Sequence, residues 1–171
     1  MVRSRTGGKN TVNKFVISVD PGKATGLSVF SWTKGEEPVM LESAEVQFES
    51  YAPWIRQWLD SYFLQDFDER AELVIVCERF TINAQTVRNS QAPYSLEEIG
   101  VLKQIMLDYS LDPDDIKFQS PADAKAMFDN PKLKKLEYWH RGGEGHALDS
   151  IRHGLLYMVK SGWSPLHRLR D

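Results

Sequence analysis

Cysteine is almost absent from this chain, since Cys77 is the only one among 171 residues. A single cysteine excludes an internal disulfide, which fits a reducing compartment. No apolar run approaches the roughly 20 residues that a membrane-spanning helix needs, and the first 14 residues lack the apolar core of a secretion signal. We therefore expect a cytoplasmic protein that has no membrane partner.

The chain also lacks an excess of positive charge. Its 21 Lys and Arg are outnumbered by 24 Asp and Glu, and the net charge of −3 by itself argues against a nucleic-acid partner. The charges are grouped, however, with basic residues concentrated in 1–14, 125–141 and 160–170 and acidic residues in 60–72 and 108–115. Local basic surfaces are compatible with such grouping, although each group can equally be a set of solvated lysines on a helix.

What the chain does have is enough apolar material for one domain. Hydrophobic residues make up 42 % of the sequence, which is typical of a globular protein of this length. Residues 1–14 show no apolar periodicity and predict a flexible basic tail. Residues 15–171 are then expected to form a single domain.

Hydrophobic spacing predicts the secondary structure of that domain. Strands are expected at 15–19, 26–32, 39–48, 73–77 and 116–119, and helices at 51–64, 95–109, from 121 onward and at 146–160. Ser95 and Glu98 have the spacing of a capping box and mark the start of the second helix. The order of elements predicts an α/β fold with a five-stranded mixed sheet, its first three strands antiparallel, flanked by helices.

Two carboxylates stand at the ends of predicted buried strands. Asp20 ends VISVD and is followed by a Pro-Gly turn, and Glu78 ends LVIVCE. One such aspartate is readily explained as turn chemistry. A second carboxylate in the same position is harder to explain in that way, so both are candidate functional residues.

The last predicted helix, GHALDSIRHGLLYMVK, adds further polar candidates. Its apolar residues share one side, whereas His146, Asp149 and His153 lie on the opposite side. A polar helix face is ordinarily exposed to solvent, but together with Asp20 and Glu78 it suggests a metal site. Carboxylates with one imidazole suit Mg²⁺ or Mn²⁺. Two such ions relieve the mutual repulsion of the carboxylates and form the charge clamp used in phosphodiester hydrolysis.

Three segments, SVDPGKATGLSVF, VIVCERF and GHALDSIRHGL, resemble a known family in their order and spacing. The chain looks like a RuvC-type Holliday junction resolvase of the RNase H-like superfamily, and most like its compact phage-encoded members. The resemblance implies a structure-selective endonuclease in a bacterium or a phage-infected host cell. It also implies two Mg²⁺ ions per active site, with Mn²⁺ as an alternative.

The resemblance assigns catalytic and metal-binding roles to four positions. Asp20, Glu78 and Asp149 match the family's metal-binding carboxylates. His146 falls where most relatives carry Asp and some carry His, so it is expected to be a metal ligand or a base for the attacking water.

The resemblance also implies that the partners are branched DNA, above all the four-way junction, and a second copy of the chain in a homodimer. The expected DNA-binding residues are Arg79, Phe80, Lys125, Lys132, Lys134 and Lys135. Phe80 is the nearest candidate for the family's base-wedging aromatic residue, although its spacing differs and a loop-packing role explains it equally well.

Three other functions compete with this hypothesis. A flap, fork or RNA–DNA hybrid nuclease on the same fold would use the same carboxylates on another substrate. A sugar kinase or actin-like ATPase shares the underlying fold but needs two duplicated domains, for which the chain is short. A non-catalytic DNA-binding module would be expected to lack one of the three carboxylates.

Overall fold

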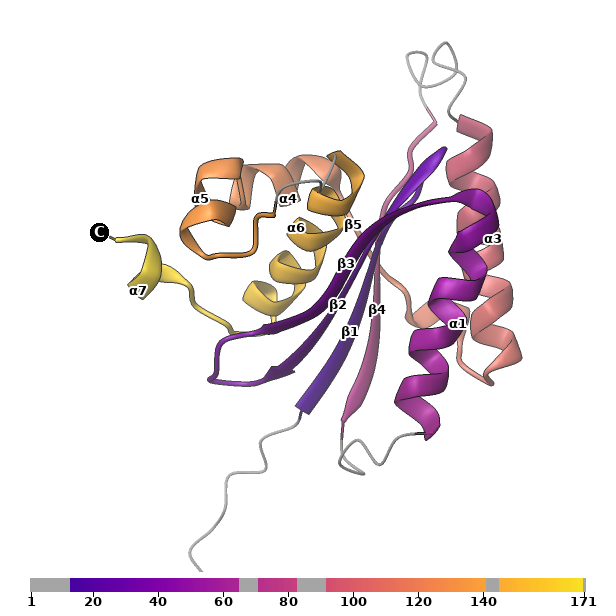
Figure 1. Cartoon of the computed structure of the whole chain (residues 1–171), viewed down its shortest axis with the longest axis horizontal. Coiled ribbons are helices and arrows are strands. Elements are labelled where there is room, and N and C mark those ends of the chain that lie inside the picture. The colour runs from indigo at the N-terminus through magenta and orange to yellow at the C-terminus, as the bar shows by residue number, and fades with distance from the viewer. Residues whose placement is uncertain (1–12, 65–70, 83–91, 141–144, 171) are drawn as a thin grey trace, which may run out of the picture.

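In the computed structural model, which describes residues 13–64, 71–82, 92–140 and 145–170, one mixed sheet runs through the protein (Figure 1). Its strand order is β3-β2-β1-β4-β5. The strands are β1 (Asn13–Asp20), β2 (Ala24–Thr33), β3 (Val39–Gln47), β4 (Glu72–Glu78) and β5 (Lys117–Gln119). β1, β2 and β3 are antiparallel neighbours, whereas β4 pairs in parallel with β1 and β5 in parallel with β4. This confirms the predicted five-stranded mixed sheet.

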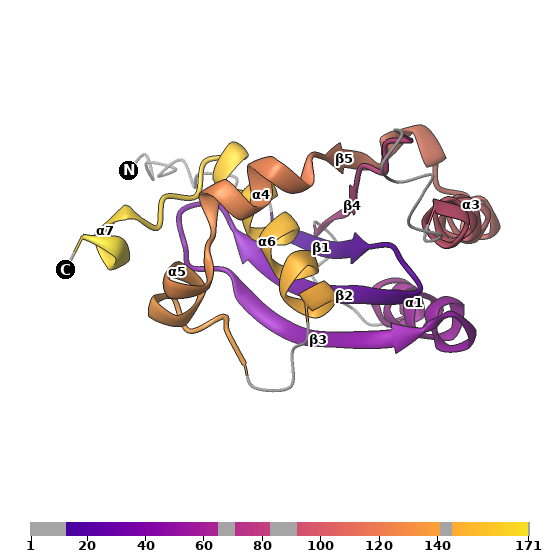
Figure 2. The same ribbon diagram turned by 90° about the horizontal axis from the view of Figure 1, so that it is seen from above.

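Helices cover both faces of the sheet (Figures 1 and 2). They are α1 (Phe48–Leu64), α3 (Ala92–Asp108), the 3-10 turn η1 (Pro113–Asp115), α4 (Pro121–Met127), α5 (Asn130–Lys135), α6 (Gly145–Lys160) and α7 (Leu166–Leu169). α1 and α3 lie on one face, and α4, α5 and α6 lie on the other. No helix in the described ranges is long and apolar enough to cross a membrane.

Alternation along β1 divides its side chains between two cores. Phe15, Ile17 and Val19 pack in the core under α1 and α3, whereas Val16 packs in the core under α6. The same alternation directs Asp20 to the α6 face. The strand therefore anchors itself in both cores while presenting one carboxylate at its end.

α6 packs closely on the sheet because two glycines leave room for it. A Cβ on Gly26 of β2 would lie 1.7 Å from the carbonyl oxygen of His146, and one on Gly154 would lie 2.7 Å from the ring of Phe30. Because Gly26 has no Cβ, the first turn of α6 can rest on the β2 backbone. The close approach brings the polar side chains of α6 within hydrogen-bond distance of the strand ends.

The structure moves several predicted boundaries. β1 begins at Asn13, so Asn13 and Lys14 belong to the sheet and not to the predicted tail; the amine of Lys14 lies 2.9 Å from Glu72. The rest of that tail, residues 1–12, is outside the described residues. α5 and α7 were not predicted, because helices of six and four residues are too short to show a helical period.

Candidate active site at the end of the sheet

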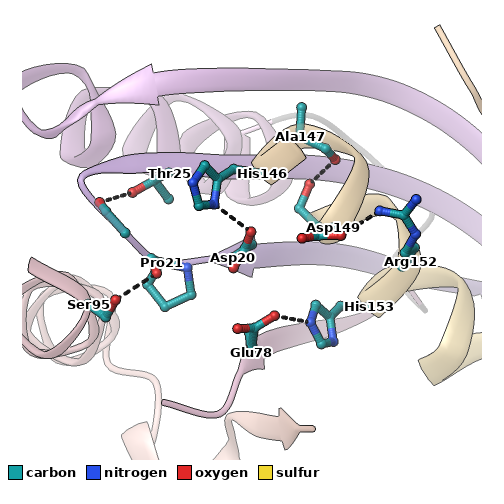
Figure 3. Close-up of polar contacts among 12 residues, drawn as sticks. Asp20, Pro21, Thr25, Glu78, Ser95, His146, Ala147, Asp149, Arg152 and His153 are labelled. Atoms are coloured by element: carbon teal, nitrogen blue, oxygen red, sulfur yellow. Dashed lines mark hydrogen bonds and ion pairs between the residues drawn. The ribbon is translucent and has the colours of Figure 1, made fainter. Parts of the chain in front are cut away.

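The candidate site begins with two neighbouring parallel strands. Val19 of β1 is in register with Cys77 of β4, so the following residues, Asp20 and Glu78, leave the sheet at the same level. Both carboxylates project toward α6 (Figure 3). Asp20 is only 4 % exposed, which is unusual for a carboxylate and requires partners. The convergence of these two strand ends is the geometry that the sequence predicted.

α6 supplies those partners from its polar side. His146 Nδ1 lies 2.9 Å from Asp20 Oδ2, and His153 Nε2 lies 2.9 Å from Glu78 Oε2. Residues seven apart on a helix point in nearly the same direction, which places the two imidazoles two turns apart over the two strand ends. This polar face is not simply exposed to solvent: His153 is 1 % exposed, whereas the His146 side chain is 39 % exposed.

Asp149 lies between the two histidines and is held by two cations. Lys125 Nζ of α4 is 3.0 Å from Asp149 Oδ2, and Arg152 binds the other carboxylate oxygen at 2.5 Å. Arg152 is itself buried, and its Nε donates to the carbonyl of Phe128 at 2.7 Å. Its remaining nitrogen donates to the side chain of Asn130. The guanidinium therefore fixes Asp149 from α6 and ties it to the α4–α5 connection.

Burial and neighbouring charges shape the titration of the site. Burial raises the pKa of Asp20 to about 6, the hydrogen bond from His146 opposes this shift, and the negative charges of Glu78 and Asp149 add to it. The hydrogen bond and charge of Asp20 raise the pKa of His146 in turn, against the effect of burial. Glu78 and Asp149 are therefore close enough to Asp20 to disfavour its ionisation.

Side chains of α3 hold the turn after Asp20 in place by hydrogen bonds. Glu98 is fully buried and accepts hydrogen bonds from the hydroxyl of Thr25 and from the N–H of Gly22 at 3.1 Å. The hydroxyl of Ser95 donates to the carbonyl of Pro21 at 2.9 Å. The predicted capping box was wrong: α3 begins at Ala92, so Ser95 and Glu98 lie inside the helix and serve tertiary contacts.

The described residues contain no ready-made group of three His, Cys, Asp or Glu side chains with the geometry to hold a metal ion. Each carboxylate is instead paired with a protein cation or imidazole. The donor set of three carboxylates and one imidazole is nevertheless the chemistry that Mg²⁺ and Mn²⁺ bind. The negative charges of Glu78 and Asp149 raise the pKa of Asp20, and a bound cation relieves repulsion of this kind.

The predicted DNA-binding residues fall into three places. Arg79 and Phe80 directly follow β4, with Arg79 exposed and Phe80 partly buried. Lys125 lies in the site itself. Lys132, Lys134 and Lys135 lie on α5, where the Lys132 amine caps the Met127 carbonyl at 3.0 Å and Lys134 lies 4.6 Å from the ring centroid of Trp139.

A hollow of about 570 Å³ lies between Lys125 and the start of α5. It is lined by Lys125, Asp149 and Arg152 on one side and by Asp129 and Asn130, at the start of α5, on the other. The α5 lysines therefore belong to an element that borders the candidate site. The sequence predicted the basic group but not this proximity.

Four residues that shape the site were given no role there from the sequence. These are Thr25, Glu98, Arg152 and His153. His153 shares the helix face of His146 and Asp149, and that spacing was its only signal. Glu98 carried no usable signal, because its partners lie more than 70 positions away in sequence.

The fold is that of RuvC. A structure of Thermus thermophilus RuvC in complex with a Holliday junction substrate matches with a TM-score of 0.58 at 11 % identity, covering 87 % of this chain and 96 % of that one. A second T. thermophilus RuvC structure gives a TM-score of 0.59 at 12 % identity, covering 86 % and 96 %. A fowlpox virus resolvase in complex with Holliday junction DNA gives 0.48 at 14 % identity, covering 87 % and 99 %.

No protein-family profile and no curated protein matches the sequence. The structural likeness at these identities shows the fold, which confirms the predicted RNase H-like architecture of the RuvC type. Function therefore has to be argued from the site.

Proposed function

We propose that this protein is a metal-dependent endonuclease that cleaves branched DNA, with the four-way junction as its main substrate. The observation that carries the proposal is the convergence of Asp20, Glu78, His146 and Asp149 at one end of a sheet with the RuvC fold. RuvC of T. thermophilus is known in complex with a Holliday junction substrate. A fold shared over 87 % of the chain makes the same substrate class the first to test.

Asp20, Glu78, Asp149 and His146 would hold Mg²⁺, with Mn²⁺ as a substitute. The fit rests on the donor types and on the buried Asp20 carboxylate, whose ionisation Glu78 and Asp149 oppose. A pair of divalent ions supplies charge neutralisation and an activated water for phosphodiester hydrolysis. The protein's own part is to fix the carboxylates, which Arg152 does for Asp149.

Lys125 is suited to contact the DNA backbone. Its side chain is 58 % exposed although its amine pairs with Asp149. A phosphate entering the hollow beside Asp149 would therefore meet a positive charge that is already held in place. The α5 lysines, together with Arg79 and Phe80, would extend this contact along the DNA. Such contacts confer affinity without sequence choice.

A homodimer follows from the substrate. A four-way junction has two-fold symmetry, so paired nicks on opposite strands require two sites related by a two-fold axis. We therefore expect the active form to contain two copies of the chain. Sedimentation of the protein with and without junction DNA tests this expectation.

The decisive experiment measures cleavage of a synthetic four-way junction with and without Mg²⁺. Asp20→Asn should abolish cleavage while keeping junction binding, whereas Asp123→Asn, an exposed aspartate on α4, should leave cleavage unchanged. Equal activity of wild type and Asp20→Asn would refute the site. Mn²⁺ should replace Mg²⁺, and EDTA should stop the reaction.

A panel of substrates tests the choice of DNA. Paired symmetric nicks in four-way junctions, with weaker cleavage of flaps, forks and RNA–DNA hybrids, are the expected result. Preferential cleavage of one of those alternatives would keep the nuclease chemistry and transfer the assignment to that substrate.

A further inference from the structure

His153 is a buried imidazole with both ring nitrogens engaged. It is 1 % exposed on α6, its Nε2 lies 2.9 Å from Glu78 Oε2, and its Nδ1 lies 3.1 Å from Gln119 Oε1. A buried ring of this kind is tolerated only when its polar atoms have partners. Both partners come from strand ends, so the ring connects the helix to the edge of the sheet.

The two partners of His153 face each other across neighbouring strands. Glu78 of β4 and Gln119 of β5 are register partners, so their side chains project from the same face of the sheet. The N–H of Arg79 donates to the carbonyl of Gln119 at 2.7 Å, which continues the pairing past Glu78. Three elements, α6, β4 and β5, therefore fix the position of the ring.

The chain of contacts runs from the interior to one functional group. Gln119 is 6 % exposed and His153 1 %, whereas the Glu78 side chain is 20 % exposed and ends at the candidate site. A purely structural contact would be expected to end inside the core. This one ends on the carboxylate whose orientation the proposed metal site depends on.

We propose that His153, supported by Gln119, is a positioning residue that fixes the orientation of the Glu78 carboxylate. The proposal rests on the proposed function, since Glu78 is there a metal ligand. Hydrogen bonds to ligating carboxylates orient them, and loss of such a partner typically lowers metal affinity or activity about 10–100-fold. His153 itself touches neither the DNA nor the reacting phosphate.

Two amide substitutions separate the two contacts of the ring. The amide nitrogen of His153→Gln occupies roughly the place of Nε2 and keeps a donor for Glu78. His153→Asn ends near Nδ1, so it keeps the contact to Gln119 and loses the one to Glu78. We expect His153→Asn to lower the cleavage rate about 10–100-fold and to raise the Mg²⁺ concentration for half-maximal cleavage. His153→Gln should recover most of that loss.

A readout without DNA makes the test independent of substrate. Mn²⁺ should raise the melting temperature of the wild type, and the increase should be much reduced in His153→Asn and largely restored in His153→Gln. Ser150→Ala is the control, because Ser150 is a buried polar residue of α6 whose hydroxyl donates only to the carbonyl of Ala147. Its Mn²⁺-induced shift should equal that of the wild type.

Gln119→Leu covers the case in which His153→Asn fails to fold. It removes the inner partner of the ring and leaves His153 and Glu78 in place. We expect this variant to need more Mg²⁺ for half-maximal cleavage and to show a smaller Mn²⁺-induced rise in melting temperature than the wild type. Both effects should be weaker than in His153→Asn.

The outcomes distinguish this inference from the proposed function. Suppose that the protein cuts no branched DNA and still shows an Mn²⁺-induced rise in melting temperature that is lost in His153→Asn and restored in His153→Gln. That result would support the positioning role and refute the nuclease. Cleavage and metal response that are the same in His153→Asn and His153→Gln would overturn the positioning role and leave the nuclease standing. A wild type with neither metal response nor cleavage would overturn both.

Discussion

Glu98 of α3 and Thr25 of β2 are joined by a buried hydrogen bond across the turn that follows Asp20. The carboxylate also accepts from the N–H of Gly22, and burial raises its pKa. Its other oxygen, Oε1, is buried without a partner among the described residues. The turn is thus held by an acidic group whose own burial is costly, which makes each of its hydrogen bonds valuable.

Thr25→Val removes one of these hydrogen bonds while preserving the shape of the side chain. We expect the free energy of unfolding, measured by urea denaturation, to fall by about 1–3 kcal/mol, because the Glu98 carboxylate loses a donor in a buried site. Thr25→Ser keeps the hydroxyl and should lose less. If the valine variant is as stable as the wild type, the hydrogen bond does not hold the turn.

Gly26→Ala tests the close approach of α6 to β2. The new Cβ would meet the backbone of His146, which cannot move aside like a flexible side chain, so a loss of at least about 2 kcal/mol is expected. Gly100→Ala is the matched control. That glycine lies within α3 with no atom near its Cβ position, and alanine there should stabilise by up to about 1 kcal/mol. Equal effects of the two substitutions would contradict the packing of α6.

Asp20→Asn should stabilise the metal-free protein at neutral pH. The folded-state pKa of about 6 lies above the ordinary value of 3.8, so the folded protein binds the extra proton between these values and wild-type stability falls as pH rises through this window. The asparagine variant has no such titration. Its melting temperature in EDTA should exceed that of the wild type above pH 6, by the equivalent of about 3 kcal/mol, and the difference should shrink toward pH 4. A constant difference across that range would show that Asp20 titrates normally.

Lys125 and Arg152 bind the same carboxylate but should fail in different ways. Lys125→Ala removes an exposed amine, so we expect an unchanged melting temperature and a reduced rate of junction cleavage. Arg152→Met leaves three buried or half-buried oxygens without their donor and should lower the free energy of unfolding by about 3 kcal/mol or more. Thermal melting and cleavage measured on both variants separate a role in DNA contact from one in folding. Similar destabilisation by both would remove the distinction.

The α5 lysines are expected to act by neutralising DNA phosphates. The double substitution Lys134→Ala and Lys135→Ala should weaken junction binding in EDTA. It should also reduce the dependence of log affinity on log salt by about 1 for each phosphate that is no longer neutralised. Lys103→Ala, on α3 on the opposite face of the sheet, is the control and should leave both quantities unchanged. An unchanged salt dependence of the double variant would remove α5 from the DNA interface.

The sequence predicted those parts of the molecule that depend on local pattern. Period-two runs and turn signals located all five strands, and the strand ends at Asp20 and Glu78 revealed two site residues, because parallel neighbours end at the same edge. Helical spacing placed His146, Asp149 and His153 on one face, and the family resemblance singled out His146 and Asp149 among them. The grouping of these four residues therefore needed local pattern, the expected order of the strands and the family resemblance.

The other contacts of the site join elements that are far apart in sequence. The spacing of residues within one element does not reveal them. Ser95 and Glu98 have capping-box spacing, yet the tertiary partners Pro21 and Thr25 take up their side chains. The polar face of α6 was predicted to join Asp20 and Glu78, but helical spacing does not show which of its side chains become buried there. Helical spacing therefore put His153 on the same face as His146 and Asp149, but it did not predict the buried contact with Glu78.

The dependence of the site on α6 has a consequence for the newly made protein. Asp20 and its partner His146 are 126 positions apart, and β1, β2, β3 and β4 all leave the ribosome before α6 does. Sheet formation alone therefore supplies two of the four proposed ligands, and contacts of such long sequence separation are slow to form because of the entropy of loop closure. An unfinished chain lacks His146 and Asp149, so under the proposed function DNA cutting would begin only once the last long helix has docked.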